Sequence, residues 1–329
     1  MREALAATAH FRGMARVGRW EAAFWLALVL AYFVPATNHA LLGQILIWGL
    51  FALSLDLLLG YRGIASLGHA AFYGIGAYGA GWLGKYGWTE PISALLLSGL
   101  LAGLVGLATG HLVRRLQGVA LLMVTLGLNL LLFDLAQRSS EITGGDDGLQ
   151  GIEVAPVLGL FRFDMAGHTA YLYVLAVALL VTLLVRGLVQ SPWGLALRGA
   201  RDNARRMAML GAPVDRDLTL SFGLSAAIAG LAGALMTQTS SFVSPEVLSF
   251  QRSADVLVML VIGGTGLLYG GFMGALVYLV LRDQFAAANP IHWYFWIGLL
   301  LVLVVTFFRA GILPALADRL RRHKPGGLS

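Results

Sequence analysis

The residues most suggestive of ligand binding or catalysis lie in the stretch SLGHAAFYGIGAYGAG, residues 66–81. Gly74, Gly76 and Gly79 have the Gly-x-Gly-x-x-Gly spacing of a dinucleotide-binding turn, where glycines let the backbone approach a pyrophosphate. Such a turn follows a strand in a soluble βαβ unit and needs an acidic residue about 20 positions later. Here both flanks are long apolar runs, so the spacing does not indicate a nucleotide site.

Two pairs of polar residues lie within apolar runs. Ser66 and His69 are three residues apart, and Thr125 and Asn129 are four apart, so each pair shares one face of a helix. Polar groups at membrane depth must face protein or water. Each pair could hydrogen-bond a neighbouring helix or line the path of a transported solute. We therefore name all four as candidate residues of a translocation path.

The chain shows no catalytic constellation. Its seven histidines form no metal-binding spacing, and it has no cysteine for a disulfide, a thiolate or a metal. It also lacks a Walker A motif, so we do not expect it to hydrolyse nucleotide itself. We expect no cofactor or metal on this chain, and no Asp or Arg at the centre of the membrane.

Composition defines the elements that must position these residues. Of 329 residues, 58% are hydrophobic and only 12% are charged, whereas soluble domains have about 25% charged residues. This composition predicts an all-α polytopic membrane protein. Ten apolar runs are expected as spans, at 20–35, 40–60, 64–84, 92–113, 118–137, 169–187, 217–241, 254–270, 271–288 and 293–309.

Loop charge predicts the orientation. Arginines lie in the N-terminal tail (1–19), in the loops 111–117 and 188–216 and in the C-terminal tail (310–329), whereas the loop 138–168 is acidic. The positive-inside rule places the basic segments in the cytoplasm. Both termini are cytoplasmic only if 254–288 crosses twice; a re-entrant pair there would put the C-terminal tail outside. The membrane domain is then 20–309.

Glycine patterns predict close helix packing. Gly99, Gly103, Gly106 and Gly110 recur every three or four residues, and Gly270 and Gly274 do the same; such stripes let helices approach closely in lipid. Seven glycines in 60–81 predict a weak, easily interrupted helix. Spans 2–5 and 7–10 run in opposite directions, which permits an inverted repeat.

The segment 191–211 predicts a cytoplasmic helix. Ser191-Pro192 is a typical start and Gly211 a typical stop. Leu197, Ala200, Ala204 and Met207 form an apolar stripe, and Arg198, Arg201 and Arg205 share another face. Such a helix could lie on anionic lipid or dock on a cytosolic partner, and its compact LGAP ending favours docking.

The chain resembles the permeases of branched-chain amino acid ABC importers, in particular the LivM-like half. The resemblance runs over about 30–310, and three segments carry it: GIASLGHAAFYGIGAY (63–78); GVALLMVTLGLNLLL with the later EITGGDDGL (118–149); and SPWGLALRGARDNARRMAMLGAPV (191–214), followed by FGLSAAIAGLAGAL. Two positions depart from the family pattern. Arg201-Asp202-Asn203 replaces a Glu-Asn or Glu-Asp, and Gly270-Gly271 replaces a glycine-proline.

This resemblance implies a ten-span permease of the bacterial inner membrane. The implied partners are a homologous permease, two cytosolic ATPases that use ATP and Mg²⁺, and an extracytoplasmic binding protein. The helix 191–211 would be the coupling helix that fits a groove on an ATPase. The coupling residues would then be Arg198, Ala200, Arg201, Asn203, Ala204 and Gly211.

The substrate stays open at this point. Branched-chain amino acids fit weakly polar, glycine- and alanine-rich spans, but relatives of the family carry urea, short amides or aromatic acids. An ion-coupled secondary transporter would need a titratable group at mid-membrane, and only His69 qualifies. A membrane-embedded enzyme is disfavoured because no catalytic pair is present.

Overall fold

The structure is a computed structural model that describes residues 19–34, 38–164 and 167–288, with a few single positions between 292 and 306. Within these residues the secondary structure is helical apart from two isolated bridges. The described helices are α2 (Arg19–Ala31), α3 (His39–Asp56), the π-helical turn η1 (Leu57–Tyr61), α4 (His69–Lys85), α5 (Pro91–Val113), α6 (Val119–Arg138), α7 (Ser140–Thr143), η2 (Gly145–Asp147), α8 (His168–Gln190), α9 (Pro192–Met209), α10 (Val214–Ser240), η3 (Pro245–Leu248), α11 (Phe250–Gly263) and α12 (Gly270–Ala288).

A helix occupies each of the first nine predicted spans, and most of the tenth, 293–309, lies outside the described residues. Five helical segments are long and apolar enough to cross a membrane: His39–Tyr61, Pro91–Val113, Val119–Arg138, His168–Gln190 and Val214–Ser240. The structure is therefore that of a polytopic membrane protein. The count of ten spans and the two tails stay predictions.

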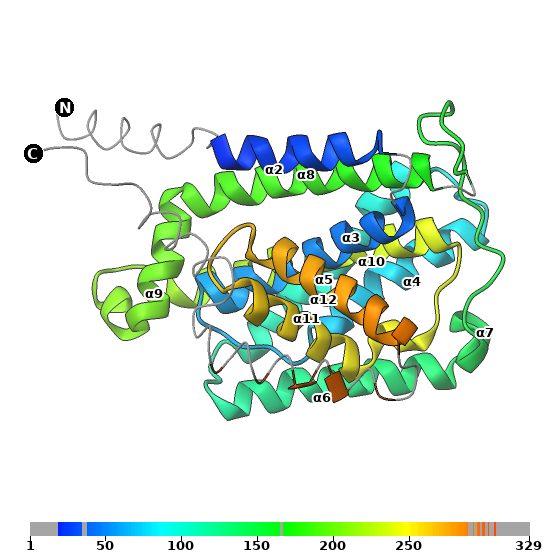
Figure 1. The fold of residues 1–329 in the computed structure, drawn as a ribbon. Coiled ribbons are helices and arrows are strands. Elements are labelled where there is room, and N and C mark those ends of the chain that lie inside the picture. Colours follow the sequence, from blue (N-terminus) through cyan, green and yellow to red (C-terminus); the bar gives the residue numbers. More distant parts are fainter. Residues whose placement is uncertain are drawn as a thin grey trace, which may run out of the picture.

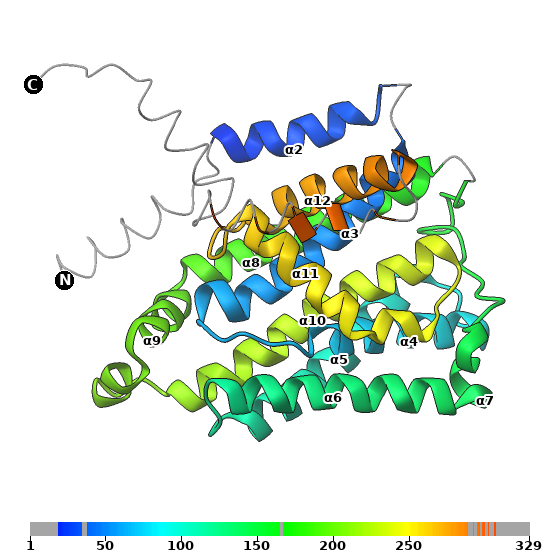
Figure 2. The ribbon, with the colours of Figure 1, turned by 60° about the horizontal axis from the view of Figure 1, so that its bottom comes forward.

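Helix α10 lies at the centre of the packing. The predicted glycine stripe of α5 faces it: a Cβ on Gly106 would overlap the side chain of Ala226, and one on Gly103 would lie 3.1 Å from Ala227. Figure 2 shows α10 crossing behind α11 and close to α4 and α5, while α6 lies at the margin of the bundle. The expectation that this stripe brings two helices together is confirmed.

Two membrane segments are interrupted by non-helical chain. The chain leaves η1 and runs without helix through 62–68 before α4 begins at His69. It leaves α10 in the same way and passes through 241–249, with only the short η3, before α11 begins at Phe250. The first break is the weak helix that the glycines of 60–81 predicted. Both halves thus contain a long helix, a break and a shorter helix, an arrangement compatible with the inverted repeat that the span directions permit.

Helices α11 and α12 form an antiparallel hairpin. The Tyr278 hydroxyl donates a 2.8 Å hydrogen bond to Asp255 on the other helix. The two backbones also pack closely, because a Cβ on Gly263 or Gly274 would overlap the backbone of the other helix. The segment 254–288 is therefore two helices with a sharp turn between them. Helix α11 has 14 residues, which span about 21 Å, less than the roughly 30 Å of a bilayer core.

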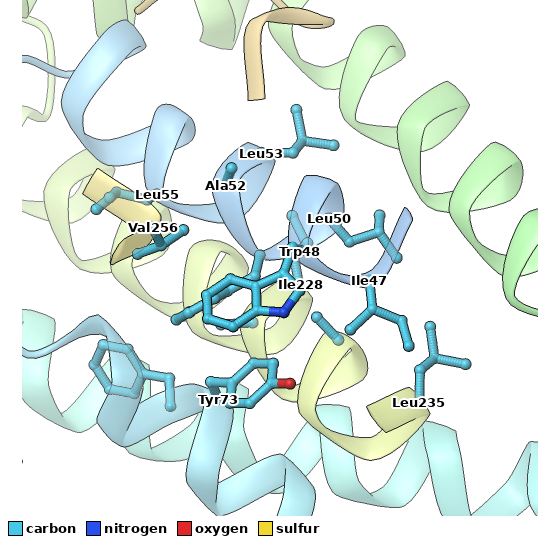
Figure 3. Packing of buried hydrophobic residues seen from close by; sticks show 14 of the residues in the cluster. Ile47, Trp48, Leu50, Ala52, Leu53, Leu55, Tyr73, Ile228, Leu235 and Val256 are labelled. Atoms are coloured by element: carbon cyan, nitrogen blue, oxygen red, sulfur yellow. The ribbon is translucent and has the colours of Figure 1, made fainter. Parts of the chain in front are cut away.

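The two ends of the bundle differ in the charge of their loops, basic around α9 and acidic beside α7. Figure 1 shows α9 at one end and α7, beside the acidic loop, at the other. We call these the α9 end and the α7 end. Between them the core is built around α3, where Figure 3 shows Trp48 close to Tyr73; their ring centroids are 6.3 Å apart and nearly parallel. This packing fixes α3 against α4 and the start of α11.

Candidate functional site: a polar junction, a charged cleft and a terminal helix

The two interrupted segments meet through their helix starts. The backbone N–H of Ala70, in the first turn of α4, donates a 2.9 Å hydrogen bond to the hydroxyl of Ser253, in the first turn of α11. Ser253 is fully buried. The N–H groups of a first helical turn have no partner within their own helix, so this contact satisfies one of them and fixes the two starts together. We call this region the junction.

Helix α6 supplies the polar pair that holds both breaks. The hydroxyl of Thr125 accepts a 3.3 Å hydrogen bond from the backbone N–H of Leu67, in the first break. The side-chain amide of Asn129 donates a 2.9 Å hydrogen bond to the carbonyl of Leu248, in the second. Both residues are buried. The sequence left open a hydrogen-bonding role or a path-lining role for this pair, and the structure shows the hydrogen bonds.

Ser66 and His69 lie at the same junction, inside the chain. The Nε2 of His69 is 2.9 Å from the hydroxyl of Ser54 on α3 and 3.3 Å from that of Ser225 on α10. Ser66 accepts a 3.4 Å hydrogen bond from Gly68. Both residues are buried, and His69 faces helices of its own chain. Whether solute passes near them stays a prediction.

Beside the junction lies a charged cleft that the sequence analysis missed. Its charged lining comes from the segment before α11, from α11 itself and from α12, and consists of Glu246, Arg252, Asp255, Arg282 and Asp283. Ser249 and Gln251 add polar atoms to a cavity of about 590 Å³. The cleft contains charges of both signs and opens on the surface of the described chain.

The depth of the cleft follows from its neighbours. The guanidinium of Arg252 lies 5.3 Å from the ring centroid of Trp48, and Trp48 is near the middle of the apolar segment His39–Tyr61. Arg252 is also the immediate sequence neighbour of Ser253, in the first turn of α11. The cleft therefore lies level with the middle of this apolar segment, and within a membrane a charged surface must face water or protein.

Only part of the charge in the cleft is neutralised internally. Asp255 accepts hydrogen bonds from Gln251 (2.9 Å) and Tyr278 (2.8 Å). Arg252 is 4.0 Å from Glu246, whose side chain is 80% exposed, so that pair is weak. Within the part of the chain that the structure describes, Arg282 and Asp283 make no ion pair. Their charges are available to further groups.

The expectation of no central Asp or Arg stays a prediction, but three charged residues bear on it. Asp255, Arg282 and Asp283 stand within the predicted spans 254–270 and 271–288, and a charge within a span is itself a signal of function. The packing of α11 on α12 brings these residues to one cleft.

Helix α9 begins and ends as the sequence predicted but bends in the middle. Pro192 occupies its first turn, and Gly211 has a φ of +87° just after its end. Asn203 has extended backbone and its side chain accepts a 2.8 Å hydrogen bond from the N–H of Arg206. Asn203 therefore caps a second short helix, and the continuous apolar stripe predicted from Leu197 to Met207 is broken there.

Two arginines predicted to touch a partner form hydrogen bonds within the chain, although Arg201 stays exposed. Arg198 donates a 2.9 Å hydrogen bond to the carbonyl of Val189, at the end of α8, and Arg201 donates one to the carbonyl of Gly60, in η1. Both arginines cap the carbonyl ends of membrane helices. Ala200 is buried. Ala204 is partly buried, so it and Asn203 keep some outward surface.

The most exposed apolar side chains at the end of α9 lie beyond the bend. Met209 and Leu210 are 76% and 74% exposed, and Arg205 and Arg206 are exposed beside them. Large apolar side chains rimmed by arginines are typical of a protein contact surface. We call Arg205, Arg206, Met209 and Leu210 the α9 tip. No group of three metal-ligating side chains occurs among the described residues.

Comparison with known proteins settles the family. Residues 39–305 match the family model described as "Branched-chain amino acid transport system / permease component". The chain belongs to this family. Over 297 residues it is 30% identical to the "High-affinity branched-chain amino acid transport system permease protein LivM" of Escherichia coli (strain K12), covering 84% of this chain and 70% of that protein. The predicted LivM-like resemblance is confirmed.

Relatives of both permease types match this member of the branched-chain amino acid permease family. A "Probable branched-chain amino acid transport permease protein LivM" of Methanocaldococcus jannaschii is 24% identical over 326 residues, covering 83% of this chain and 93% of that protein. The same organism's "Probable branched-chain amino acid transport permease protein LivH" is 30% identical over 149 residues, covering 44% and 47%. No solved structure matches significantly. The chain is a multi-pass transport component, and the junction and cleft lie within its family-matched region.

Proposed function

We propose that this chain is a transmembrane permease subunit of an ATP-driven importer for branched-chain amino acids in the bacterial inner membrane. It would form the path with a homologous permease, and two cytosolic ATPases and an extracytoplasmic binding protein would complete the importer. Similarity to both LivM and LivH proteins supports a pair of homologous permeases. The observation that carries the proposal is the charged cleft at mid-membrane depth.

The cleft suits a zwitterion. An amino acid presents a carboxylate and an ammonium close together, and the cleft offers guanidinium groups (Arg252, Arg282) beside carboxylates (Asp255, Asp283). Arg252 also stands in the first turn of α11, where the helix dipole favours an anion. Urea and short amides carry neither charge and would leave Arg282 and Asp283 unmatched, so this chemistry favours an amino acid.

The open side of the cleft would be covered by the second permease, since charged groups cannot face lipid at this depth. Solute would then pass between the two permeases. The aliphatic side chain of a branched-chain amino acid would contact the small apolar residues around the charges, such as Ala286. An aromatic acid stays the closest alternative substrate, because it has the same charged ends.

The driving motion would enter through α9. The positive-inside rule places the α9 end in the cytoplasm together with both termini, where the α9 tip would seat on an ATPase. ATP and Mg²⁺ would be bound by the ATPases, and this chain would bind no cofactor. Because Arg198 ties α9 to α8 and Arg201 ties it to η1, movement of α9 would be passed to two membrane segments and would open the path alternately to each side.

The competing function is an ion-coupled secondary transporter. Asp255 and Asp283 are titratable groups at mid-membrane, which such a transporter requires. It would give no role to the exposed apolar α9 tip, which costs hydration free energy unless a partner covers it. An energy-source experiment separates the two functions directly.

The test is uptake of radiolabelled leucine by proteoliposomes that contain this chain with its partner permease, ATPases and binding protein. We expect uptake to require ATP inside the vesicles and to be competed by isoleucine and valine, but not by urea or acetamide. A proton or sodium gradient alone should drive none. Uptake driven by a gradient without ATP would establish the secondary transporter, and competition by phenylalanine rather than leucine would move the substrate to aromatic acids.

A further inference from the structure

A second basic cavity lies at the α9 end, away from the charged cleft. It has a volume of about 470 Å³ and is enclosed by the first break, the α5–α6 turn, α9 and the start of α10. Three arginines line it, one from each of three segments: Arg62, Arg114 and Arg201. The lining contains one acidic residue, Asp215. The cavity is therefore strongly basic, and neither the transport path nor the α9 tip uses it.

Arg62 is the residue that the fold leaves unexplained. It is only 5% exposed, its Nε is buried without a hydrogen-bond partner, and within the described residues it forms no ion pair. Burial lowers the pKa of its guanidinium, and the negative charges of Asp217 and Asp215 oppose this only in part. A buried charge without an acceptor is costly. The conformation is best explained by an anion that Arg62 holds.

The neighbouring arginines have donors to spare. Arg201 uses one N–H on the carbonyl of Gly60, and Arg114 makes one long contact of 3.5 Å with His111. Each guanidinium carries five N–H donors in a planar fork, a geometry that matches phosphate oxygens in pairs. Three guanidinium groups that line one cavity suit a phosphate group better than a single carboxylate.

One wall of the cavity is apolar and continues onto the outer surface of the bundle. Leu116, Val119 and Leu122 line it, and Val119, at the start of α6, is 68% exposed. Only 22% of the apolar stretch of α6 is buried within the described chain. A hydrocarbon chain can therefore lie along this helix in the membrane. The cavity thus combines a basic pocket with an apolar exit along α6, the combination that a phospholipid headgroup and acyl chain require.

We propose that this cavity binds the phosphate group of an anionic phospholipid of the cytoplasmic leaflet. The headgroup sits between Arg62, Arg114 and Arg201, and one acyl chain follows the apolar wall onto α6. Because Ala200 and Arg201 of α9 also line the cavity, the lipid joins α9 to the α5–α6 turn. Phosphatidylglycerol serves as the probe, since its phosphate carries the required charge.

The test is native mass spectrometry of the complete transporter, purified in detergent and incubated with phosphatidylglycerol or phosphatidylethanolamine. We expect the wild type to retain phosphatidylglycerol in preference, and Arg62→Gln to bind it about tenfold more weakly, as loss of one charge-assisted contact predicts. Arg115→Gln is the matched control, because Arg115 is exposed in the same turn but does not line the cavity. It should bind as the wild type does.

Two further measurements keep the proposal open to refutation. If Arg62→Gln does not assemble, Arg114→Gln, at a less buried position, should show the same selective loss. Inorganic phosphate, titrated into the delipidated transporter, should neither raise its melting temperature nor displace phosphatidylglycerol at millimolar concentration. Equal lipid retention by the cavity variants and the control would overturn the site. Tight binding of inorganic phosphate alone would show that a soluble anion, and not a lipid, fills it.

Discussion

The backbone N–H of Ala70 donates a 2.9 Å hydrogen bond to the hydroxyl of Ser253, joining the starts of two interrupted membrane helices that are 183 residues apart in the sequence. Thr125 and Asn129 of α6 hold the two breaks beside this contact. Arg252 of the charged cleft is the immediate neighbour of Ser253. The geometry of the cleft therefore depends on the junction, and weakening the junction should disturb transport without removing any charge.

Ser253→Ala tests this dependence. The substitution leaves a buried N–H of Ala70 without a partner and should lower the free energy of unfolding by roughly 0.6–1.7 kcal/mol, the range of hydrogen bonds inside membranes. The melting temperature of the purified complex and its leucine uptake should both fall. Ser140→Ala, an exposed serine of α7, is the control. Equal stability and uptake in both variants would show that the junction does not support the cleft.

Gly106→Val tests the packing of α5 on α10. A Cβ at Gly106 would overlap Ala226 and crowd the Phe222 carbonyl, so the helices must separate and lose contacts along the stripe. We expect poor assembly, with a loss of about 1–3 kcal/mol or more for overpacking a tight core. Gly127→Val on α6 meets no atom within 4 Å and should assemble normally, as monitored by size-exclusion chromatography of a fluorescent fusion. Normal behaviour of Gly106→Val would refute the close approach.

Leu210→Asp tests the α9 tip. Leu210 is 74% exposed, so a charge there should not harm folding but should weaken docking on an apolar groove of the ATPase. We expect the ATPases to be lost during co-purification and ATP-dependent uptake to cease. Leu158→Asp, at a residue 69% exposed at the α7 end, should leave both unchanged. Full retention of the ATPases by Leu210→Asp would place their docking surface elsewhere.

Local sequence patterns predicted much of the fold. The apolar runs located the helices, the glycines of 60–81 marked the first break, and the stripe from Gly99 to Gly110 marked the face that meets α10. These features depend on near neighbours in the sequence, such as a 3.6-residue period or a helix-weakening residue. They hold whatever the rest of the chain does, which is why they could be predicted.

The site depended on distant parts of the chain. Arg198 and Arg201 were expected to face a partner, but carbonyls at Val189 and Gly60 lie within their reach, and no local pattern shows where a helix end will stand. The bend at Asn203 could have been suspected, because asparagine is a common N-cap. The cleft was predictable in part: Asp255, Arg282 and Asp283 are charges within apolar spans, although their meeting depends on the α11–α12 hairpin.

The central claim is that the charged cleft is a water-filled path for an amino acid, and cysteine accessibility tests it most directly. The chain has no native cysteine, so Ala286→Cys, in the cleft, and Leu276→Cys, on the outer surface of α12, can be compared in the same assembled transporter. A charged, membrane-impermeant thiol reagent should modify Ala286→Cys, saturating leucine should slow that reaction at least several-fold, and Leu276→Cys should not react. No modification of Ala286→Cys, or a rate that leucine leaves unchanged, would contradict the account.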